Sequence, residues 1–224
     1  MNERKIPLPI KLGFTAFMGV LVPFYWAEYG PTNFLYFCDI ALFFALIGIW
    51  SERAIWASMA LIGIAIPQVL WQVDFLGSLC GMPVTGMTGY MFDAEISKFA
   101  RGLSFFHFWL PFLLAYMVWR LGYDRRALWG WTIVAIVAML FSYTMLPAPG
   151  DTLAFANQPH NVNYVFGPAG DESQNWMPPL AWLATLLIGL PALIYLPTHW
   201  VCTSLIERVR GPGAAAGKSG KADE

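Results

Sequence analysis

Six long runs of apolar residues dominate the chain. They are Leu12–Trp26, Phe34–Trp50, Ala54–Phe75, Leu103–Leu121, Ala127–Leu146 and Met177–Val201. A bilayer core about 30 Å thick needs ~20 residues of helix at ~1.5 Å per residue, and the runs approach that length with few charges. Because backbone groups in lipid must be hydrogen-bonded internally, helices are favoured over the short alternating segments of a β-barrel. The pattern therefore predicts an all-α, polytopic membrane protein with six transmembrane helices.

The composition agrees with this class. Hydrophobic residues make up 58% of the 224 residues and charged residues only 12%, well below the share usual in soluble domains. We expect one six-helix membrane domain over residues 1–210 and a disordered cytoplasmic tail over residues 211–224, which is rich in Gly, Ala and Ser. The net charge of −1 carries no nucleic-acid signature. Membrane lipids, and other membrane subunits, are the partners that this composition suggests.

The basic residues sort to one side of the predicted bundle. With alternating helices and a cytoplasmic N-terminus, eleven of the thirteen Lys and Arg residues fall on the cytoplasmic side, and only Lys98 and Arg101 fall on the other. This distribution follows the positive-inside rule. It predicts that both termini are cytoplasmic. The location we expect for this multi-pass chain is a bacterial inner membrane.

Two long segments, Gly77–Gly102 and Pro147–Trp176, fall on the predicted outer side. Each exceeds the ~12–15 residues beyond which a loop without secondary structure tends to be functional or disordered. The second contains His160 and Asn163 among large apolar residues, so it could fold back onto the helix ends. If the chain has a site, we expect it on this side.

Three predicted helices place polar side chains in one layer near the outer side. Polar groups at membrane depth are costly and usually face the interior of a bundle. The predicted layer lies roughly 7–12 Å below the outer helix ends at ~1.5 Å per residue. Its members are Cys38, Asp39, Gln68, Gln72, Ser104 and His107.

A cysteine beside a histidine suggests nucleophilic chemistry. A nearby base converts a thiol into a nucleophile, and histidine is the usual base for cysteine. At this depth a pair formed by Cys38 and His107 would meet the glycerol esters of a phospholipid. Attack would give a thioester and a lysolipid, and transfer to an alcohol, a lysolipid or water would complete the cycle. Gln68, Ser104 or a backbone N–H could donate to the oxyanion.

Structural roles are the competing interpretation of the same residues. Cys38 also suits a small apolar position, Asp39 a hydrated helix end, and His107 a structural hydrogen bond. The two glutamines could join helices. Asp74 is expected at the interface, and His160 could reach the layer or be solvated.

The segment Phe37-Cys38-Asp39-Ile40-Ala41-Leu42 resembles the Leu-Cys-Asp-ϕ-x-Leu stretch of YwaF-type bacterial integral membrane proteins and their eukaryotic transmembrane acyltransferase relatives. Gln68 in the next helix, His107 after an outer loop and the stretch Asn163-Tyr164-Val165-Phe166 follow in the order of that family. The resemblance covers roughly residues 33 to 200. For eukaryotic relatives it implies cysteine-dependent phospholipid acyl transfer, with Cys38 as nucleophile and His107 as base.

Three hypotheses follow from the sequence. The first is an intramembrane acyltransferase or lipase that acts near the outer leaflet without a cofactor. The second is a non-catalytic accessory or scaffold subunit of a larger membrane complex. The third is a transporter or haem binder, although His107 and His199 are predicted on opposite sides. The spacing of Cys38, Cys80 and Cys202 suggests neither a disulfide framework nor a metal site.

Overall fold

The computed structural model describes residues 5–155, 157–170 and 172–210, and the predicted tail at 211–224 lies outside them. Within this range the chain is helical, with no strand, which confirms the predicted class. The helices are α1 (Leu8–Tyr29), α2 (Phe37–Ser51), α3 (Ala54–Leu79), α4 (Lys98–Ser104), α5 (Phe106–Leu121), α6 (Ala127–Met145), α7 (Pro179–Leu190) and α8 (Leu196–Arg210). Short turns of other helix types are η1 (Pro31–Leu35), η2 (Gly89–Met91), η3 (Val162–Tyr164) and η4 (Pro191–Tyr195).

Five helical segments of the described chain are long and apolar enough to cross a membrane. They are Leu8–Tyr29, Ala54–Leu79, Lys98–Leu121, Ala127–Met145 and Pro179–Leu205. The sixth predicted run is the shorter apolar helix α2, which has 15 residues and is therefore below the ~20 residues of a full span. Its first residues belong to the separate turn η1, because Tyr36 has an extended backbone (φ −59°, ψ 139°) and α2 begins only at Phe37.

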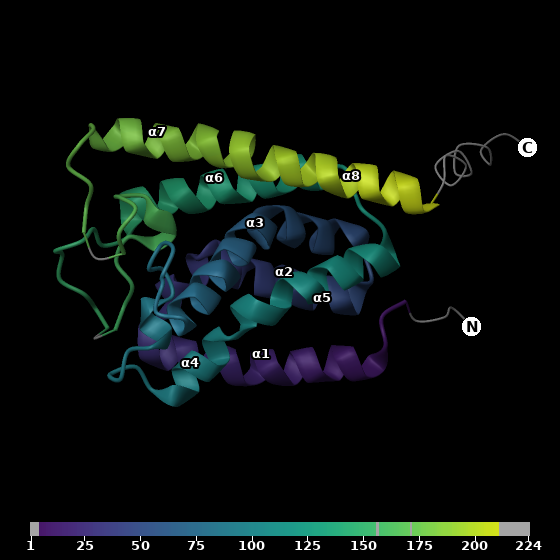
Figure 1. Ribbon diagram of the computed structural model, residues 1–224, viewed down its shortest axis with the longest axis horizontal. Helices are drawn as coiled ribbons and strands as arrows, with labels where there is room; N and C mark the ends of the chain where they lie inside the picture. Colours follow the sequence, from purple (N-terminus) through teal and green to yellow (C-terminus); the bar gives the residue numbers. More distant parts are fainter. Residues whose placement is uncertain (1–4, 156, 171, 211–224) are drawn as a thin grey trace, which may run out of the picture.

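Helix α3 occupies the centre of the bundle. It packs against α2, α5 and α6, while α1 packs against α2 and η1. Figure 1 shows α7 and α8 running as one long rod beside α6, on the opposite side of the bundle from α1. The short α4 joins the start of α5 with only Phe105 between them, so the predicted fourth span is a bent helix.

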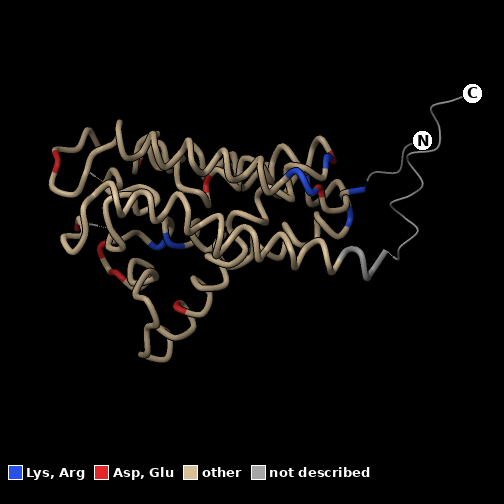
Figure 2. Tube along the Cα trace, turned by 90° about the horizontal axis from the view of Figure 1, so that it is seen from above, with Lys and Arg blue, Asp and Glu red and all other residues tan. Residues whose placement is uncertain are grey.

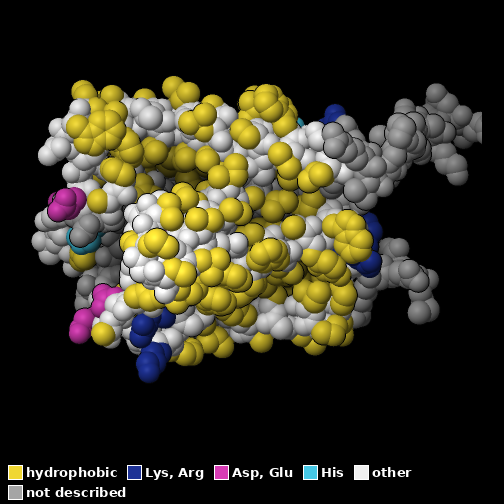
Figure 3. Space-filling view, in the orientation of Figure 1, with side chains coloured by type: hydrophobic (Ala, Val, Ile, Leu, Met, Phe, Trp, Pro, Cys, Tyr) yellow, Lys and Arg dark blue, Asp and Glu magenta, His cyan; other side chains and the backbone are white. Residues whose placement is uncertain are grey.

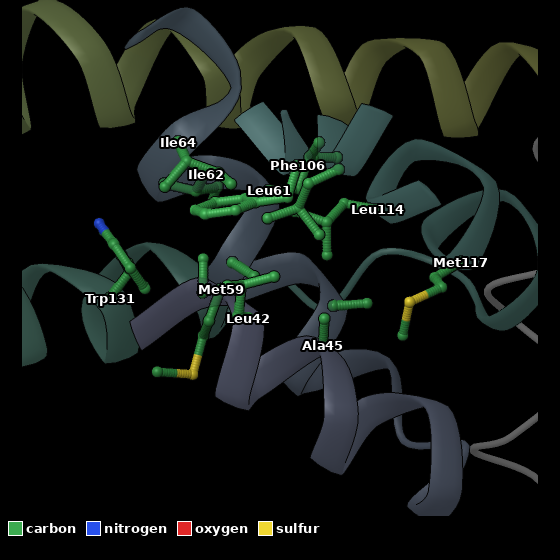
Figure 4. Packing of buried hydrophobic residues seen from close by; sticks show 14 of the residues in the cluster. Leu42, Ala45, Met59, Leu61, Ile62, Ile64, Phe106, Leu114, Met117 and Trp131 are labelled. Atoms are coloured by element: carbon green, nitrogen blue, oxygen red, sulfur yellow. The ribbon is translucent and has the colours of Figure 1, made fainter. Parts of the chain in front are cut away.

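The core is apolar and tightly packed around α3 (Figure 4). Leu42, Ile62 and Leu114 are fully buried. Gly63 is required where α6 meets α3, since a Cβ atom there would lie 1.8 Å from the Trp131 ring. A larger residue at position 63 would force the two helices apart.

Charged residues gather at the ends of the bundle, and apolar side chains cover the visible face between them (Figures 2 and 3). One end, here called the basic end, carries Lys5, Lys11, Arg53, Arg120 and Arg126 around the α2–α3 and α5–α6 turns. The other, here called the loop end, carries the connections after α3 and α6. This distribution is typical of a membrane-embedded bundle.

Glu52 joins two segments of the chain at the basic end. It ends α2 in the left-handed conformation (φ 51°). Its carboxylate accepts hydrogen bonds from Lys11 Nζ at 2.7 Å and from the backbone N–H groups of Lys5 and Ile6 at 3.1 and 3.2 Å. Partial burial opposes ionisation, but these donors together lower the pKa of Glu52. The start of α1 is thereby tied to the α2–α3 turn.

Candidate functional site

Cys38 and Asp39 lie in the first turn of α2 at the loop end, closer to the helix start than the sequence pattern predicted. The Cys38 side chain is half-buried and has a free thiol. Asp39 is buried, with 3% of its surface exposed, and its Oδ2 accepts a hydrogen bond from Asn33 Nδ2 at 3.2 Å. Its Oδ1 has no hydrogen-bond partner among the described residues. Such a group is costly at membrane depth, which makes Asp39 a candidate functional residue.

Asn163 fixes the start of α2 from the loop before α7. Its Oδ1 accepts the backbone N–H of Phe37 at 3.0 Å, and its Nδ2 donates to the carbonyl of Leu35 at 2.8 Å. The N-cap residue, Tyr36, provides no side-chain cap, so a residue 126 positions away replaces it. Asn163 therefore positions the backbone one residue before Cys38.

The loop that carries Asn163 is held in a strained conformation. Asn161, Asn163 and Tyr164 have φ angles of 49°, 58° and 60°, a region that asparagine tolerates better than tyrosine. Asn161 stabilises the turn by accepting from the Phe166 N–H at 2.7 Å and donating to the carbonyl of Gly167 at 2.8 Å. Strain of this kind concentrates where the surrounding structure fixes a functional geometry.

The ring of His107 is fixed on two sides. Its Nδ1 lies 2.7 Å from the carbonyl oxygen of Ser104. Since a carbonyl only accepts, Nδ1 carries the proton and Nε2 keeps its lone pair. The ring stacks on Trp71 of α3, with centroids 5.3 Å apart and planes inclined by 19°. His107 is therefore held in the tautomer that a general base requires.

Two tyrosines surround this histidine segment. Tyr25 and Ser104 share a hydrogen bond between hydroxyl oxygens 2.8 Å apart. Trp71 Nε1 donates to the Tyr90 hydroxyl at 3.2 Å. Burial raises the pKa of Tyr90, the Trp71 hydrogen bond opposes that rise, and the Cys38 thiol adds to it. Tyr90 is thus bonded to Trp71, the residue whose ring stacks on His107.

The predicted layer forms only in part. Across the described chain, no hydrogen bond joins Cys38 to His107, and the pairing stays a prediction. Gln72 donates to the carbonyl of Phe108 at 2.9 Å and so joins α3 to α5. Gln68 is buried with 3% exposure, and its Oε1 lacks a partner within the part of the chain that the structure describes. The hydroxyl of Ser104 is directed to Tyr25 rather than left free.

His160 contacts its own loop rather than the layer. Its Nδ1 lies 3.3 Å from the carbonyl oxygen of Ala148, a hydrogen bond within the loop. His199 lies toward the opposite end, where its Nδ1 is 2.7 Å from the Tyr123 hydroxyl. Among residues 5–155, 157–170 and 172–210, no group of three or more His, Cys, Asp or Glu side chains is arranged to hold a metal ion.

Asp74 lies near the loop end of α3, and the loop that follows folds around its carboxylate; its expected place at the membrane interface stays a prediction. Asp74 is fully buried, and its Oδ1 accepts the backbone N–H groups of Val84, Thr85 and Gly86 at 2.8, 2.5 and 2.9 Å. Its Oδ2 accepts the N–H and the hydroxyl of Thr88 at 2.9 and 2.6 Å. The Thr85-Gly86 turn that supplies two of these donors begins eleven residues after Asp74. Asp74 folds the loop that delivers Tyr90 to Trp71.

Comparison with models of known protein families, with curated proteins and with solved structures finds no match. The fold and the residues described above therefore define the chain as an α-helical protein with apolar helices suited to a membrane, and the function has to be inferred from the loop end.

Proposed function

We propose that this chain is an intramembrane acyltransferase or lipase that acts on phospholipid-type esters, with Cys38 as nucleophile and His107 as base. The observation that carries the proposal is the fixed tautomer of His107, whose Nδ1 proton is held on the Ser104 carbonyl. The Nε2 lone pair is left for the proton of a nucleophile. The resemblance of the Phe37–Leu42 segment to the YwaF-type family supports the same assignment.

The proposed reaction has two steps. In the first, His107 Nε2 takes the Cys38 proton while the sulfur attacks the ester carbonyl carbon. The bond between that carbon and the alcohol oxygen breaks, and the leaving oxygen takes the proton from His107. The products are a thioester on Cys38 and a lysolipid. In the second, a hydroxyl group or water attacks the thioester carbonyl carbon and gives its proton to Nε2. The carbon–sulfur bond breaks, the acyl group leaves as an ester or a fatty acid, and Nε2 returns the proton to the sulfur.

The surroundings of Cys38 shape how the first step proceeds. A thiolate on Cys38 would be poorly solvated at this depth, and a charge on the neighbouring Asp39 would only disfavour it further. Proton transfer to His107 should therefore accompany attack rather than precede it. Because catalytic hydrogen bonds are often long before substrate binds, the proposal requires Cys38 and His107 to approach each other when lipid enters. The Tyr90 and Tyr25 hydroxyls are the candidate oxyanion donors of the layer.

The test is labelling with an acyl-mimicking electrophile in native membranes, read by mass spectrometry at each cysteine. We expect Cys38 to be labelled in the wild type and in Cys80→Ala. Labelling should fall at least tenfold in His107→Gln and vanish in Cys38→Ala. Cys80 is exposed and serves as the control for simple accessibility. Labelling of Cys38 that does not depend on His107, or labelling of Cys80 alone, would reject the enzyme.

We also propose that the bundle lies in a bacterial inner membrane with its loop end outward, because the basic residues cluster at the other end. Cys80 offers a direct test, since it is exposed at the loop end. A membrane-impermeant maleimide should modify Cys80 in intact spheroplasts, and Cys80→Ala should remove the signal. If Cys80 is modified only after the membrane is disrupted, the loop end faces inward and the proposed orientation is wrong.

An accessory subunit of a membrane complex is the second candidate, supported by the exposure of α7 and α8. Only 11% of the most apolar 18-residue window of Pro179–Leu205 is buried, against 56% in α3. Such a helix has a large face for lipid or for another subunit. Photo-crosslinking from Ile188 and Leu193, which are 71% and 73% exposed, should capture lipid if the chain acts alone. Consistent capture of one protein would favour the subunit.

A further inference from the structure

A shallow depression of about 340 Å³, open to the surface, lies at the loop end beside α4 and is called the cavity below. It is lined by Met91, Lys98, Arg101, Gly102 and Phe105. The lining combines two cations with an aromatic ring and a thioether. This is the character expected of a site for an amphiphilic anion rather than for a purely apolar ligand.

Arg101, one of the two cations that line this cavity, has an N–H group available to a ligand. Arg101 donates one hydrogen bond, from Nη1 to the Met91 carbonyl at 3.1 Å. Its Nε is buried and has no partner among the described residues. The ion pairs found in the described chain involve other residues, Lys11 with Glu52 and Arg126 with Asp124. A buried N–H on a charged group is costly without an acceptor, and an anion in the cavity would supply one.

Charge at this end supports the same ligand. Lys98 and Arg101 are the two basic residues that the sequence places at the loop end, and Figure 3 shows basic side chains over α4, away from the basic end. The nearby acids Asp93 and Glu95 are exposed, and Asp93 Oδ1 already accepts the N–H of Glu95 at 2.9 Å. The planar fork of an arginine matches a phosphate group, and a lysine adds a second positive charge.

The position of Arg101 relates the cavity to the candidate active site. Arg101 precedes Ser104 by three residues and His107 by six, along the nearly continuous α4–α5 helix. Six helical residues rise about 9 Å at ~1.5 Å per residue, so Arg101 lies within about 9 Å of His107 along the chain, on the other side of the bend at Phe105. Phe92, Phe99 and Phe105 are exposed around α4 and suit a membrane interface.

We propose that this cavity binds the phosphate of a phospholipid headgroup, with Arg101 and Lys98 on the phosphate and Met91 and Phe105 against the glycerol region. The assignment rests on the proposed function for its role, since it would set the substrate class as a phospholipid rather than a neutral glyceride. Binding itself does not require chemistry at Cys38.

The test is lipid retention by the full chain in detergent, measured by native mass spectrometry with one added lipid at a time. The probes are phosphatidylglycerol, phosphatidylethanolamine and diacylglycerol, with inorganic phosphate as a soluble competitor. We expect both phospholipids to be retained at least ~tenfold better than diacylglycerol, because the charged hydrogen bonds are lost without the phosphate. Arg101→Gln should abolish most of that preference, and Lys98→Gln should weaken it severalfold. Arg53→Gln, an exposed basic residue at the other end, should leave it unchanged.

Lys98→Gln guards against a folding artefact, because Lys98 is exposed and its loss removes charge without disturbing the Met91 contact. Equal retention of diacylglycerol, or no effect of either loop-end variant, would overturn the proposal. Displacement of phospholipid by millimolar inorganic phosphate would assign the cavity to free phosphate and overturn the lipid site. Cys38→Ala should retain lipid normally. If lipid retention depends on the phosphate group but Cys38 is not acylated, the binding site therefore stands and the proposed enzyme activity is rejected.

Discussion

Replacing Asp74 by asparagine should release the loop that follows α3. Asparagine keeps an acceptor for the three N–H groups of Val84, Thr85 and Gly86, but those bonds lose the assistance of a negative charge. Its NH₂ group would face the Thr88 N–H, where the carboxylate now accepts at 2.9 Å. Hydrogen bonds to charged groups contribute about 1.5–3 kcal/mol against 0.5–1.5 for neutral ones, and a buried donor without an acceptor costs about 1–3 kcal/mol. We expect the local opening free energy to fall by about 3–5 kcal/mol.

Amide hydrogen exchange measures this change directly, because the bonds in question are backbone N–H groups. A loss of about 1.4 kcal/mol accelerates exchange about tenfold, so the amides of Thr85, Gly86 and Thr88 should exchange at least ~100-fold faster in Asp74→Asn. Exchange in the middle of α5 should not change. Asp93→Asn is the matched control, since Asp93 is exposed and accepts one loop N–H. Unchanged protection in Asp74→Asn, or equal acceleration in Asp93→Asn, would refute the assigned role of the carboxylate.

The other predictions concern packing, the clamp on α2 and the basic end. Gly63→Ala should lower the free energy of unfolding by about 1–3 kcal/mol by clashing with Trp131, whereas Gly19→Ala, which has open space, should raise it by up to about 1 kcal/mol in thermal melts. Asn163→Ala should cost about 1–3 kcal/mol and reduce Cys38 labelling, and unaltered labelling would contradict its positioning role. Because folding lowers the pKa of Glu52, its contribution is complete at neutral pH and disappears as the pH falls below the ordinary glutamate range. The Glu52→Gln variant should have a lower free energy of unfolding at pH 7, and this free energy should change less with pH than in the wild type. Stability profiles of the two proteins that run parallel across pH would contradict this assignment.

The helices could be predicted from the sequence because a bilayer imposes a length and a polarity that five of the described helices satisfy, while the second run gave the shorter helix α2. Their ends could not, because tertiary contacts set them. The turn at Pro31–Leu35 takes up the start of the second run, so α2 begins only at Phe37, where Asn163 replaces a local cap. A contact between residues 126 positions apart leaves no local pattern in the chain.

The candidate site could be predicted as a set of polar residues but not as a geometry. The positions of Gln68, Gln72 and His107 along their predicted helices indicated that they lie at the same depth. They did not indicate that Trp71 would stack on the imidazole ring of His107. The contacts of Asp74 could not be predicted because its five donors come from a loop, whose path hydropathy does not specify. The loop also delivers Tyr90 to Trp71, so this part of the site depends on a carboxylate that looked peripheral.

The π-helical turn η4 at Pro191–Tyr195 places the fully buried Tyr195 side chain near Trp131, with ring centroids 6.5 Å apart. A turn of this type holds one residue more than the α-helical repeat, and each residue of an α-helix rotates the chain by about 100°. The extra residue in η4 therefore sets the direction in which the side chains of α8 face the bundle. Deleting a single residue there would rotate everything downstream by that angle and turn His199 away from Tyr123, while the hydropathy profile of the helix stayed almost the same.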